Sequence, residues 1–376
     1  MHTAPRPLVF AASAALLLTL SGCTGAAEPD PPPTSPATPS ESAPPATTAA
    51  PAPLGPRQPS LNLTSPWSVA YVGNSALVSE RDTAKLIELA ENGEAREVAT
   101  VAGVVHGGEG GLLGIAVSPA AAGTQPEYLY AYSTAANGNR VERYPVTGAP
   151  GSLAIGDPTT IIDALPSAAS HNGGRIAFGP DDMLYVTVGD AAQTWLSQDL
   201  SSLGGKILRL TPDGGVPADN PFEGSPVYSY GHRNPQGIAW AADGTMYSSE
   251  FGQDTWDELN VITAGGNYGW PEVEGIAGDS RFTDPVQQWR PADASPSGIA
   301  IAGDTIYIAN LRGQRVRAVP LADLTASTDH FVGEFGRIRD VTVAPDGRLW
   351  LLSNNTDGRV DPRADDDRFI DTGLVQ

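Results

Sequence analysis

A single cysteine, Cys23, occurs in the 376 residues of the sequence. A folded domain that follows it therefore contains no disulfide bond. Positive charge is also scarce, because 22 lysine and arginine residues stand against 43 aspartate and glutamate residues, which gives a formal net charge of −21. A chain this acidic repels phosphate backbones and anionic lipid headgroups, so we expect no nucleic-acid partner.

Charged residues of both signs amount to only 17% of the chain, whereas glycine and proline contribute 42 and 34 residues. This composition argues against a bundle of helices and favours an all-β fold. Hydrophobic residues make up 40% of the chain, which is enough for a large core.

The apolar run near the N-terminus, LVFAASAALLLTL, has 13 residues and is too short to span a bilayer comfortably. It follows His2 and Arg6 and has the length of a signal-peptide core, so residues 1–22 are predicted to be a signal peptide. The string LSGC, which ends at Cys23, resembles a lipobox, in which the cysteine is diacylated and becomes the mature N-terminus. The position of the motif after the apolar run disfavours the alternative of a buried cysteine. We therefore expect the protein to be exported and to be attached to the outer face of the cell membrane through this lipid anchor only.

Proline, alanine, threonine and serine dominate residues 24–58. Such a segment cannot bury apolar area, so residues 23–58 are predicted to be a lipidated cysteine followed by a disordered stalk. The folded domain is predicted to span residues 59–376.

Six stretches share the pattern of a short alternating strand, a turn and a second such strand. They begin at Trp67, Gly114, Arg175, Gly237, Gly298 and Asp340. The equivalent positions Val69, Ile115, Ile176, Ile238, Ile299 and Val341 are separated by 46, 61, 62, 61 and 42 residues. Steps of this size are typical of propeller blades, and turns such as PDG, PDD and ADG join antiparallel strands. Six hairpins with room for two further strands each predict a six-bladed β-propeller.

A propeller fold does not specify an activity, so the loops before the inner strands are the place to look for a site. The stretch SHNGGR, residues 170–175, lies directly before the third inner strand, at the rim of the expected central channel. His171 points from this loop, although a lone histidine that caps a strand is a common alternative. Asp190 ends the following strand and is placed to accept a hydrogen bond from the imidazole.

The equivalent loop of the next blade, GHRNPQG, carries His232, Arg233 and Asn234. Further along, Arg312, Arg337 and Arg339 add positive charge to the fifth and sixth blades. A surface salt bridge would explain each arginine on its own. Four arginines near one rim of an acidic protein favour a polyanionic ligand, whose carboxylates are natural partners of guanidinium groups.

Six motifs together resemble the soluble glucose/sorbosone dehydrogenase family, the aldose sugar dehydrogenases that use pyrroloquinoline quinone (PQQ). In order, they are GEGGLLGIA, HNGGRIAFGPDDMLYVTVGD, GGKILRLTPDG, GHRNPQG, EFGQDTWDELNVITAGGNYGWP and GRIRDVTVAPDGRLWLL. The resemblance extends over residues 60–360, and its specificity lies in the agreement of six separate motifs. It implies a six-bladed propeller and a tricarboxylate cofactor, which fits the arginine cluster.

The resemblance also implies that the protein oxidises an aldose at its anomeric carbon by hydride transfer to PQQ. His171 corresponds to the general base, Asp190 to the residue that orients it, and Arg233 to the group that stabilises developing negative charge on the quinone. The other cofactor-binding positions that correspond to the family are Glu109, Asn234, Arg312, Arg337 and Arg339.

Through the same resemblance, the stretch EFGQDTWDELN implies that the protein binds Ca²⁺. Without the resemblance, this stretch is equally well explained as a solvated acidic loop. The carbonyl oxygens of Gly252 and Gln253 correspond to ligands of the calcium that also contacts the cofactor. Glu258 and the main-chain oxygen of Tyr268 correspond to ligands of a second, structural calcium. Gln253 stands where proline is frequent in the family, which still leaves a carbonyl ligand available. Ser170 stands where some members have aspartate, and this difference leaves the sugar specificity open.

Two other functions stay open at this point. A calcium-dependent propeller hydrolase, such as a lactonase, needs carboxylates that converge in the channel and has no use for four rim arginines. A non-catalytic binding lipoprotein on the cell surface fits the anchor and the stalk. For the dehydrogenase, the expected partners are a small-molecule sugar and an electron acceptor that the sequence does not identify.

Overall fold

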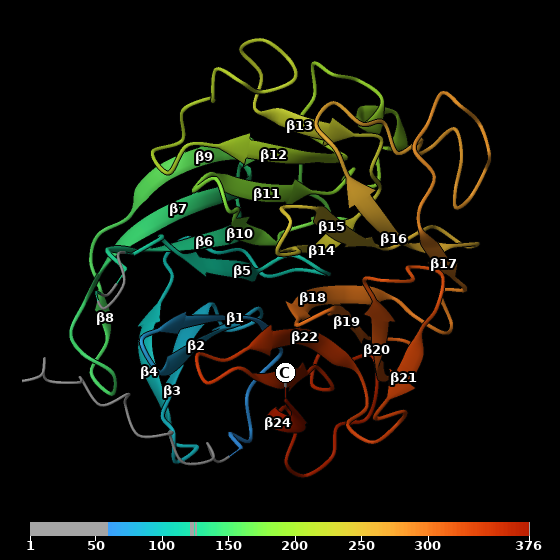
Figure 1. Ribbon diagram of the computed structural model, residues 1–376. Coiled ribbons are helices and arrows are strands. Elements are labelled where there is room, and N and C mark those ends of the chain that lie inside the picture. The colour runs from blue at the N-terminus through green and yellow to red at the C-terminus, as the bar shows by residue number, and fades with distance from the viewer. Residues whose placement is uncertain (1–58, 121–123, 125, 376) are drawn as a thin grey trace, which may run out of the picture. The chain divides into compact units, whose positions relative to one another are not determined.

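The computed structural model describes residues 59–120, 124 and 126–375. The predicted signal peptide, Cys23 and the stalk lie outside these residues. The described chain forms six antiparallel sheets that follow one another along the sequence and surround a common centre (Figure 1). The predicted six-bladed β-propeller is confirmed.

Each blade begins with its innermost strand, and its later strands lie progressively further from the centre (Figure 1). The inner strands are β1 (Pro66–Val72), β5 (Leu112–Val117), β10 (Ile176–Phe178), β14 (Pro235–Trp240), β18 (Pro296–Ala302) and β22 (Ile338–Val343). The second strands are β2 (Ser75–Glu80), β6 (Tyr128–Ala135), β11 (Leu184–Val188), β15 (Met246–Glu250), β19 (Thr305–Asn310) and β23 (Arg348–Ser353). The third strands are β3 (Lys85–Leu89), β7 (Gly138–Thr147), β12 (Lys206–Leu210), β16 (Asp257–Ile262), β20 (Arg315–Pro320) and β24 (Phe369–Val375). The outer strands are β4 (Ala95–Thr100), β8 (Ala154–Ile155), β9 (Thr159–Leu165), β13 (Val227–Tyr230), β17 (Gln287–Trp289) and β21 (Thr328–His330).

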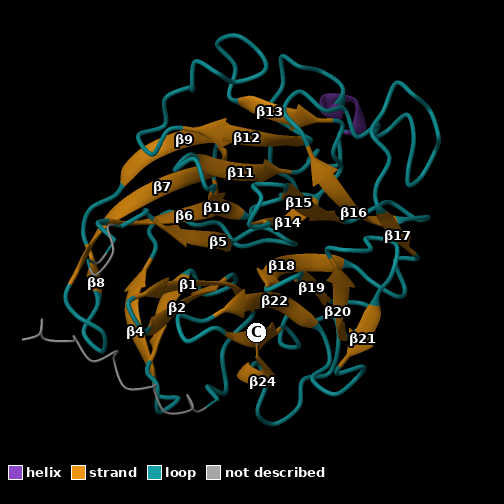
Figure 2. Cartoon of the chain, in the orientation of Figure 1, coloured by secondary structure: helices purple, strands orange, loops and turns teal. Residues whose placement is uncertain are grey.

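Almost all regular secondary structure in the described chain is β-strand (Figure 2). The turns that join the strands have the residue types expected of tight hairpins. Asp182 in the PDD turn has φ of 59°, and Gly244 in the ADG turn has φ of 87°. Both are left-handed conformations, which tight hairpin turns require and which aspartate and glycine tolerate. The helical element among the described residues is one short 3₁₀ turn, η1 (Thr194–Ser197), and no described helix has the length and apolar character to cross a membrane.

Apolar side chains hold neighbouring blades together, because each blade is covered on both faces. All six residues of β2 are buried, for example. The buried hydrophobic residues of the described chain form six clusters, one at each interface between adjacent blades. Between the third and fourth blades, Tyr185 and Ile207 pack with Ile238 and Met246. Burial of this apolar surface is the main favourable contribution to the ring.

The ring is closed by the first described residues, which pair with the last blade. The Ser60 N–H donates to the Phe369 carbonyl at 3.1 Å, and the Phe369 N–H donates back at 2.9 Å. Leu63 and Asp367 exchange a second pair of backbone bonds at 2.9 and 3.0 Å. The Leu63 side chain is buried in the cluster between the sixth and first blades. The start of the domain thus completes the three-stranded sheet β22-β23-β24.

Polar side chains tie the inner strands together at the centre. The Arg175 guanidinium lies 2.9 Å from Asp340 and 3.0 Å from the Ser68 hydroxyl, and it donates to the Gln236 carbonyl at 2.8 Å. It also stacks on the Trp67 ring at 4.4 Å. These residues come from four blades, so the network fixes the relative positions of four inner strands.

Candidate active site

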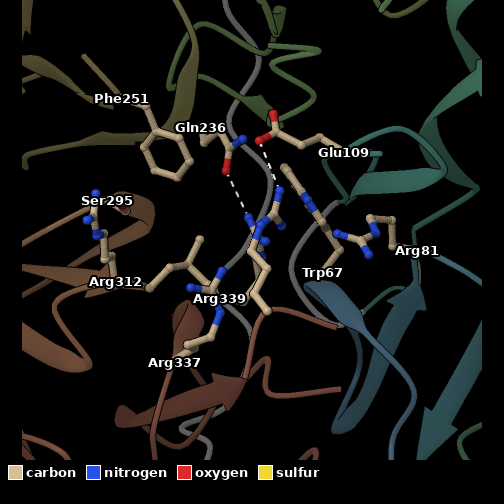
Figure 3. A pocket seen from close by; sticks show the side chains of 11 residues that line it. Trp67, Arg81, Glu109, Gln236, Phe251, Ser295, Arg312, Arg337 and Arg339 are labelled. Carbon is tan, nitrogen blue, oxygen red and sulfur yellow. Dashed lines mark hydrogen bonds and ion pairs between the residues drawn. The ribbon is translucent and has the colours of Figure 1, made fainter. Parts of the chain in front are cut away.

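A cavity of about 200 Å³ opens where the inner strands of five blades begin. Figure 3 shows arginine side chains that approach this space from different sides, with Glu109 and Gln236 at its edge. The lining residues are Trp67, Arg81, Glu109, Gln236, Phe251, Ser295, Leu311, Arg312, Arg337, Arg339 and Arg359. Three of the four arginines that the sequence singled out therefore meet in one cavity.

The positive charge of this cavity is incompletely compensated. Arg339 is 3% exposed and donates to the side-chain oxygens of Gln236 at 2.9 Å and Asn354 at 3.1 Å, which are both neutral. Burial, together with repulsion from Arg81, lowers the pKa of Arg339 to about 9. Arg312 is exposed and has no hydrogen bond or ion pair with the described residues. A bound polyanion would compensate these charges.

Two carboxylates supply the counter-charge on the side of the sixth blade. Asp357 pairs with Arg337 at 3.2 Å and with Arg359 at 3.1 Å. Burial opposes ionisation of Asp357, but Arg337 and Arg339 outweigh it and hold its pKa below the usual range. Arg359 also reaches Glu109 at 3.3 Å, which joins the sixth blade to the loop before β5. Arg337 is thus paired, whereas Arg339 and Arg312 form no ion pair with a carboxylate of the described residues.

The structure brings His171 and Asp190 together. Nδ1 of His171 lies 2.7 Å from Oδ1 of Asp190, which is completely buried. Because a carboxylate oxygen accepts, Nδ1 carries the proton and Nε2 is left as an acceptor. The His171 side chain is 14% exposed, so the ring is accessible from one side only. This pair has the arrangement of a general base and the group that orients it.

The backbone of His171 is held in a left-handed conformation, with φ of 59°. Its N–H donates to the Glu109 carboxylate at 2.9 Å, and its carbonyl accepts from Ala191 at 3.1 Å. Glu109 therefore contacts both Arg359 and the loop that carries His171. Such strain in a non-glycine residue is maintained only where surrounding contacts enforce it. The nearby Gly173 permits close approach to the carbonyl of Thr187 on β11.

Arg233 does not line the main cavity but lines the small cavity next to it. Burial lowers its pKa, and its Nε and Nη2 donate to the side-chain oxygen of Gln253 at 3.0 and 2.6 Å. Its Nη1 donates to the carbonyl of Phe251 at 3.1 Å. Phe251 lines both the main cavity and the small cavity beside Arg233. The guanidinium therefore lies next to the arginine cluster, held by the segment that follows β15.

Asn234 is buried between the third and fourth blades. Its side-chain oxygen accepts from the Gly173 N–H at 3.0 Å, whereas its Nδ2 has no hydrogen-bond partner among the described residues. A buried donor without a partner is costly, and a ligand acceptor would satisfy it. His232, the other histidine of these loops, is completely buried, and both its ring nitrogens are engaged, by Ser229 at 2.8 Å and Glu250 at 2.9 Å. Neither ring nitrogen of His232 is therefore free to accept a proton from a bound molecule.

The residues expected to bind the first calcium lie in a loop whose backbone N–H groups donate hydrogen bonds to carboxylates. Glu274 accepts the N–H of Gln253 at 2.8 Å, and Asp257 accepts the N–H of Gly252 at 2.9 Å. The carbonyl oxygens of Gly252 and Gln253 accept no backbone hydrogen bond from the described residues. Free carbonyl oxygens beside acidic side chains are suitable donors for Ca²⁺.

The residues expected to bind the second calcium line the small cavity of about 10 Å³, a volume close to that needed for one water molecule. Burial and the nearby charge of Glu250 raise the pKa of Glu258 to about 8. The Tyr268 carbonyl accepts no backbone hydrogen bond from the described residues. A cation would stabilise the buried Glu258 carboxylate. In the described part of the chain, however, no group of three or more His, Cys, Asp and Glu side chains is arranged to hold a metal.

Sequence reasoning missed several residues of the site. Gln236 and Trp270 stand inside the motifs GHRNPQG and GGNYGWP, so their position marked them although their roles were not predicted. Arg81 follows the second strand of the first repeat. Arg359 lies 250 residues from its partner Glu109, in a loop without a recognisable pattern, and only the fold reveals it.

The centre of this propeller combines a histidine–carboxylate pair with buried arginines. The profile of the glucose/sorbosone dehydrogenase family matches residues 63–361, and the chain belongs to this family. Membership places the chain among the oxidoreductases.

Three similar proteins illustrate the relation. The structure of PQQ-bound aldose sugar dehydrogenase from Streptomyces coelicolor has a TM-score of 0.79 and 48% identity, over 84% of this chain and 98% of that one. Quinoprotein glucose dehydrogenase B of Acinetobacter calcoaceticus is 33% identical over 257 residues, which are 59% of this chain and 53% of that protein. Aldose sugar dehydrogenase YliI of Escherichia coli is 29% identical over 344 residues, which are 80% of this chain and 91% of that protein. The match thus spans about half the length of the Acinetobacter protein and most of the other two.

Proposed function

We propose that this protein oxidises an aldose at its anomeric carbon to the lactone, with PQQ bound in the arginine-lined cavity. When bound, PQQ would supply the two-electron oxidant that takes the hydride from the sugar. The proposal is supported by the family, by the 48% identity to a PQQ-bound sugar dehydrogenase, and above all by the His171–Asp190 pair beside the arginine cavity.

His171 accepts the proton of the anomeric hydroxyl at Nε2. Asp190 holds Nδ1–H at 2.7 Å, which fixes the tautomer and stabilises the imidazolium that forms. Loss of this proton and of the hydride from the anomeric carbon converts the hemiacetal into the lactone. The left-handed backbone at His171, fixed by Glu109, keeps the ring at the end of its loop.

The arginines bind and polarise the cofactor. Arg312, Arg337 and Arg339 would pair with the carboxylates of PQQ, and Arg339 in particular is a buried cation without an acidic partner. The unsatisfied Nδ2 of Asn234 would donate to the cofactor. Arg233 would stabilise the negative charge that develops on a quinone oxygen, a contribution that is largest in a water-excluded site.

Calcium belongs to the proposal as a second cofactor. The carbonyl oxygens of Gly252 and Gln253 would bind the ion that also contacts PQQ, and Glu258 with the Tyr268 carbonyl would bind a structural ion. Oxygen donors of this kind are the ligands that Ca²⁺ prefers. The hydrolase alternative is less well supported, because the main cavity is lined by five arginines and a single carboxylate, that of Glu109.

Reconstitution tests the proposal. The purified protein is mixed with PQQ and Ca²⁺, and reduction of an artificial electron-accepting dye is followed across a panel of aldoses. We expect sugar-dependent reduction that requires PQQ and falls when a chelator removes calcium, with the lactone as product. Hydrolysis of sugar lactones with no dye reduction would support the hydrolase, and tight PQQ binding without turnover would support a binding protein.

A further inference from the structure

The side chain of Trp270 contacts both Asp190, the proposed partner of the base, and Arg233, the proposed partner of the quinone. Trp270 lies in the connection between β16 and β17 of the fourth blade, and Asp190 follows β11 of the third blade. The indole Nε1–H of Trp270 donates to Oδ2 of Asp190 at 2.8 Å, across 80 residues of sequence. This is a hydrogen bond between a neutral donor and a buried carboxylate, which is stronger than one between two neutral groups.

The bond to Trp270 completes the set of partners of the Asp190 carboxylate. Oδ1 accepts from Nδ1 of His171 at 2.7 Å and from the Ala192 N–H at 2.8 Å, whereas Oδ2 accepts from Trp270. With both oxygens held, the carboxylate cannot rotate about its Cβ–Cγ bond without losing a contact. Its plane therefore fixes the direction of the His171 ring.

The ring of Trp270 faces Arg233 on the other side. The Arg233 guanidinium carbon lies 5.5 Å from the indole centroid, within the range of a cation–π contact. The backbone of Trp270 is itself fixed, because its N–H donates to the Gly231 carbonyl at 2.9 Å and its carbonyl accepts from Gln198 at 2.8 Å. The backbone of Trp270 is thus fixed while its side chain contacts Asp190 through the N–H and Arg233 through the ring.

We propose that Trp270 is a positioning residue of the reaction, which holds the Asp190 carboxylate through its N–H and the Arg233 guanidinium through its ring. This inference rests on the proposed function of His171 as the base. The N–H and the ring make separate contributions, so they can be removed one at a time.

Trp270→Phe keeps a ring under Arg233 and removes the hydrogen bond to Asp190. We expect kcat to fall about 10-fold, in line with the loss of one hydrogen bond to a charged group, while KM for the sugar and Kd for PQQ stay within about 2-fold. In the protein without cofactor, the downfield proton resonance of Nδ1–H of His171 shifts or broadens, because Oδ2 of the carboxylate loses its partner and the carboxylate is held through Oδ1 alone. An unchanged resonance together with unchanged kcat overturns the proposal.

A double-mutant cycle distinguishes positioning from a general loss of structure. If Trp270 acts through Asp190, the pair of changes Trp270→Phe and Asp190→Asn lowers kcat no more than Asp190→Asn alone. If kcat of the double variant falls by the product of the two single-variant effects, the residues act independently and the inference is contradicted. Should Trp270→Phe not fold, β-(3-benzothienyl)alanine at position 270 preserves the shape of the indole and lacks the N–H, and the same outcomes apply.

Trp289→Phe is the matched control. Trp289 is also half-buried on the fourth blade and also lies under an arginine, Arg317, at 4.7 Å. Among the described residues, the tryptophan that donates a hydrogen bond to Asp190 is Trp270, not Trp289. We expect kcat and the His171 resonance to be unchanged in this variant. If His171→Gln is fully active, the proposed function fails; if only Trp270→Phe has no effect, the function stands and the positioning role does not.

Discussion

His171 combines a strained backbone, an oriented ring and limited exposure, and each of these features contributes to its proposed role as a base. We predict that His171→Gln lowers turnover about 10²–10⁴-fold, the usual contribution of a positioned general base. The fold and the binding of PQQ should be nearly unchanged, because the side chain lies at a loop end and outside the hydrophobic clusters. Steady-state dye reduction and PQQ titration measure the two effects separately.

Asp190→Asn is the companion variant. It retains the shape of the side chain but weakens the acceptor for Nδ1–H, so we expect a smaller decrease of turnover in the same direction. Full sugar-dependent activity of His171→Gln would refute the assignment, and because His232 has both ring nitrogens engaged, the base would have to be sought on another element.

Contacts between residues close in sequence could be predicted, and contacts between distant loops could not. His171 and Asp190 are 19 residues apart and separated by one hairpin, so strand geometry alone brought them to one end of a blade. Arg359 and Glu109 are 250 residues apart, and Trp270 and Asp190 are 80 apart. Their meeting depends on loop conformations, which no local periodicity encodes.

Among the elements, the inner strands could be predicted from the sequence and the outer strands could not. The inner hairpins were predictable because burial on both faces gives them apolar runs with recurrent turns. Outer strands such as β21, with the sequence TDH, are short and mostly exposed, so their sequences carry no alternating pattern. The number of blades therefore followed from the sequence, whereas the full set of strands in each blade did not.

The segment that closes the ring offers a direct test of how one element contributes to the free energy of unfolding. Leu63 is 3% exposed and packs in the same cluster as Trp350 and Phe369. We predict that Leu63→Ala lowers the free energy of unfolding by about 2–5 kcal/mol, because it removes a buried side chain from a closed core. Denaturant unfolding, followed by tryptophan fluorescence, measures the change.

Leu61→Ala is the control on the same segment. Leu61 is 40% exposed, so its replacement should change the free energy of unfolding by no more than about 0.5 kcal/mol. Equal effects of the two variants would show that the segment does not contribute to stability through the buried contact of Leu63.

For the whole molecule, the lipid anchor remains a prediction, because Cys23 lies outside the described residues. Two acyl chains on Cys23 would be enough for stable membrane attachment. We predict that Cys23→Ser moves the protein from the membrane fraction to the soluble fraction of the expressing cells. The unchanged presence of Cys23→Ser protein in the detergent phase would contradict the anchor.

The closure of the ring by Ser60 has a mechanical consequence. The described chain enters the propeller through the residues that pair with Phe369 and Asp367, and these backbone hydrogen bonds are not reinforced by any covalent link. A pulling force applied to the chain ahead of Ser60 is therefore carried first by this clasp, before any complete blade is loaded. Tension on this segment thus reaches the sixth blade first, and the arginines Arg337 and Arg339 belong to that blade.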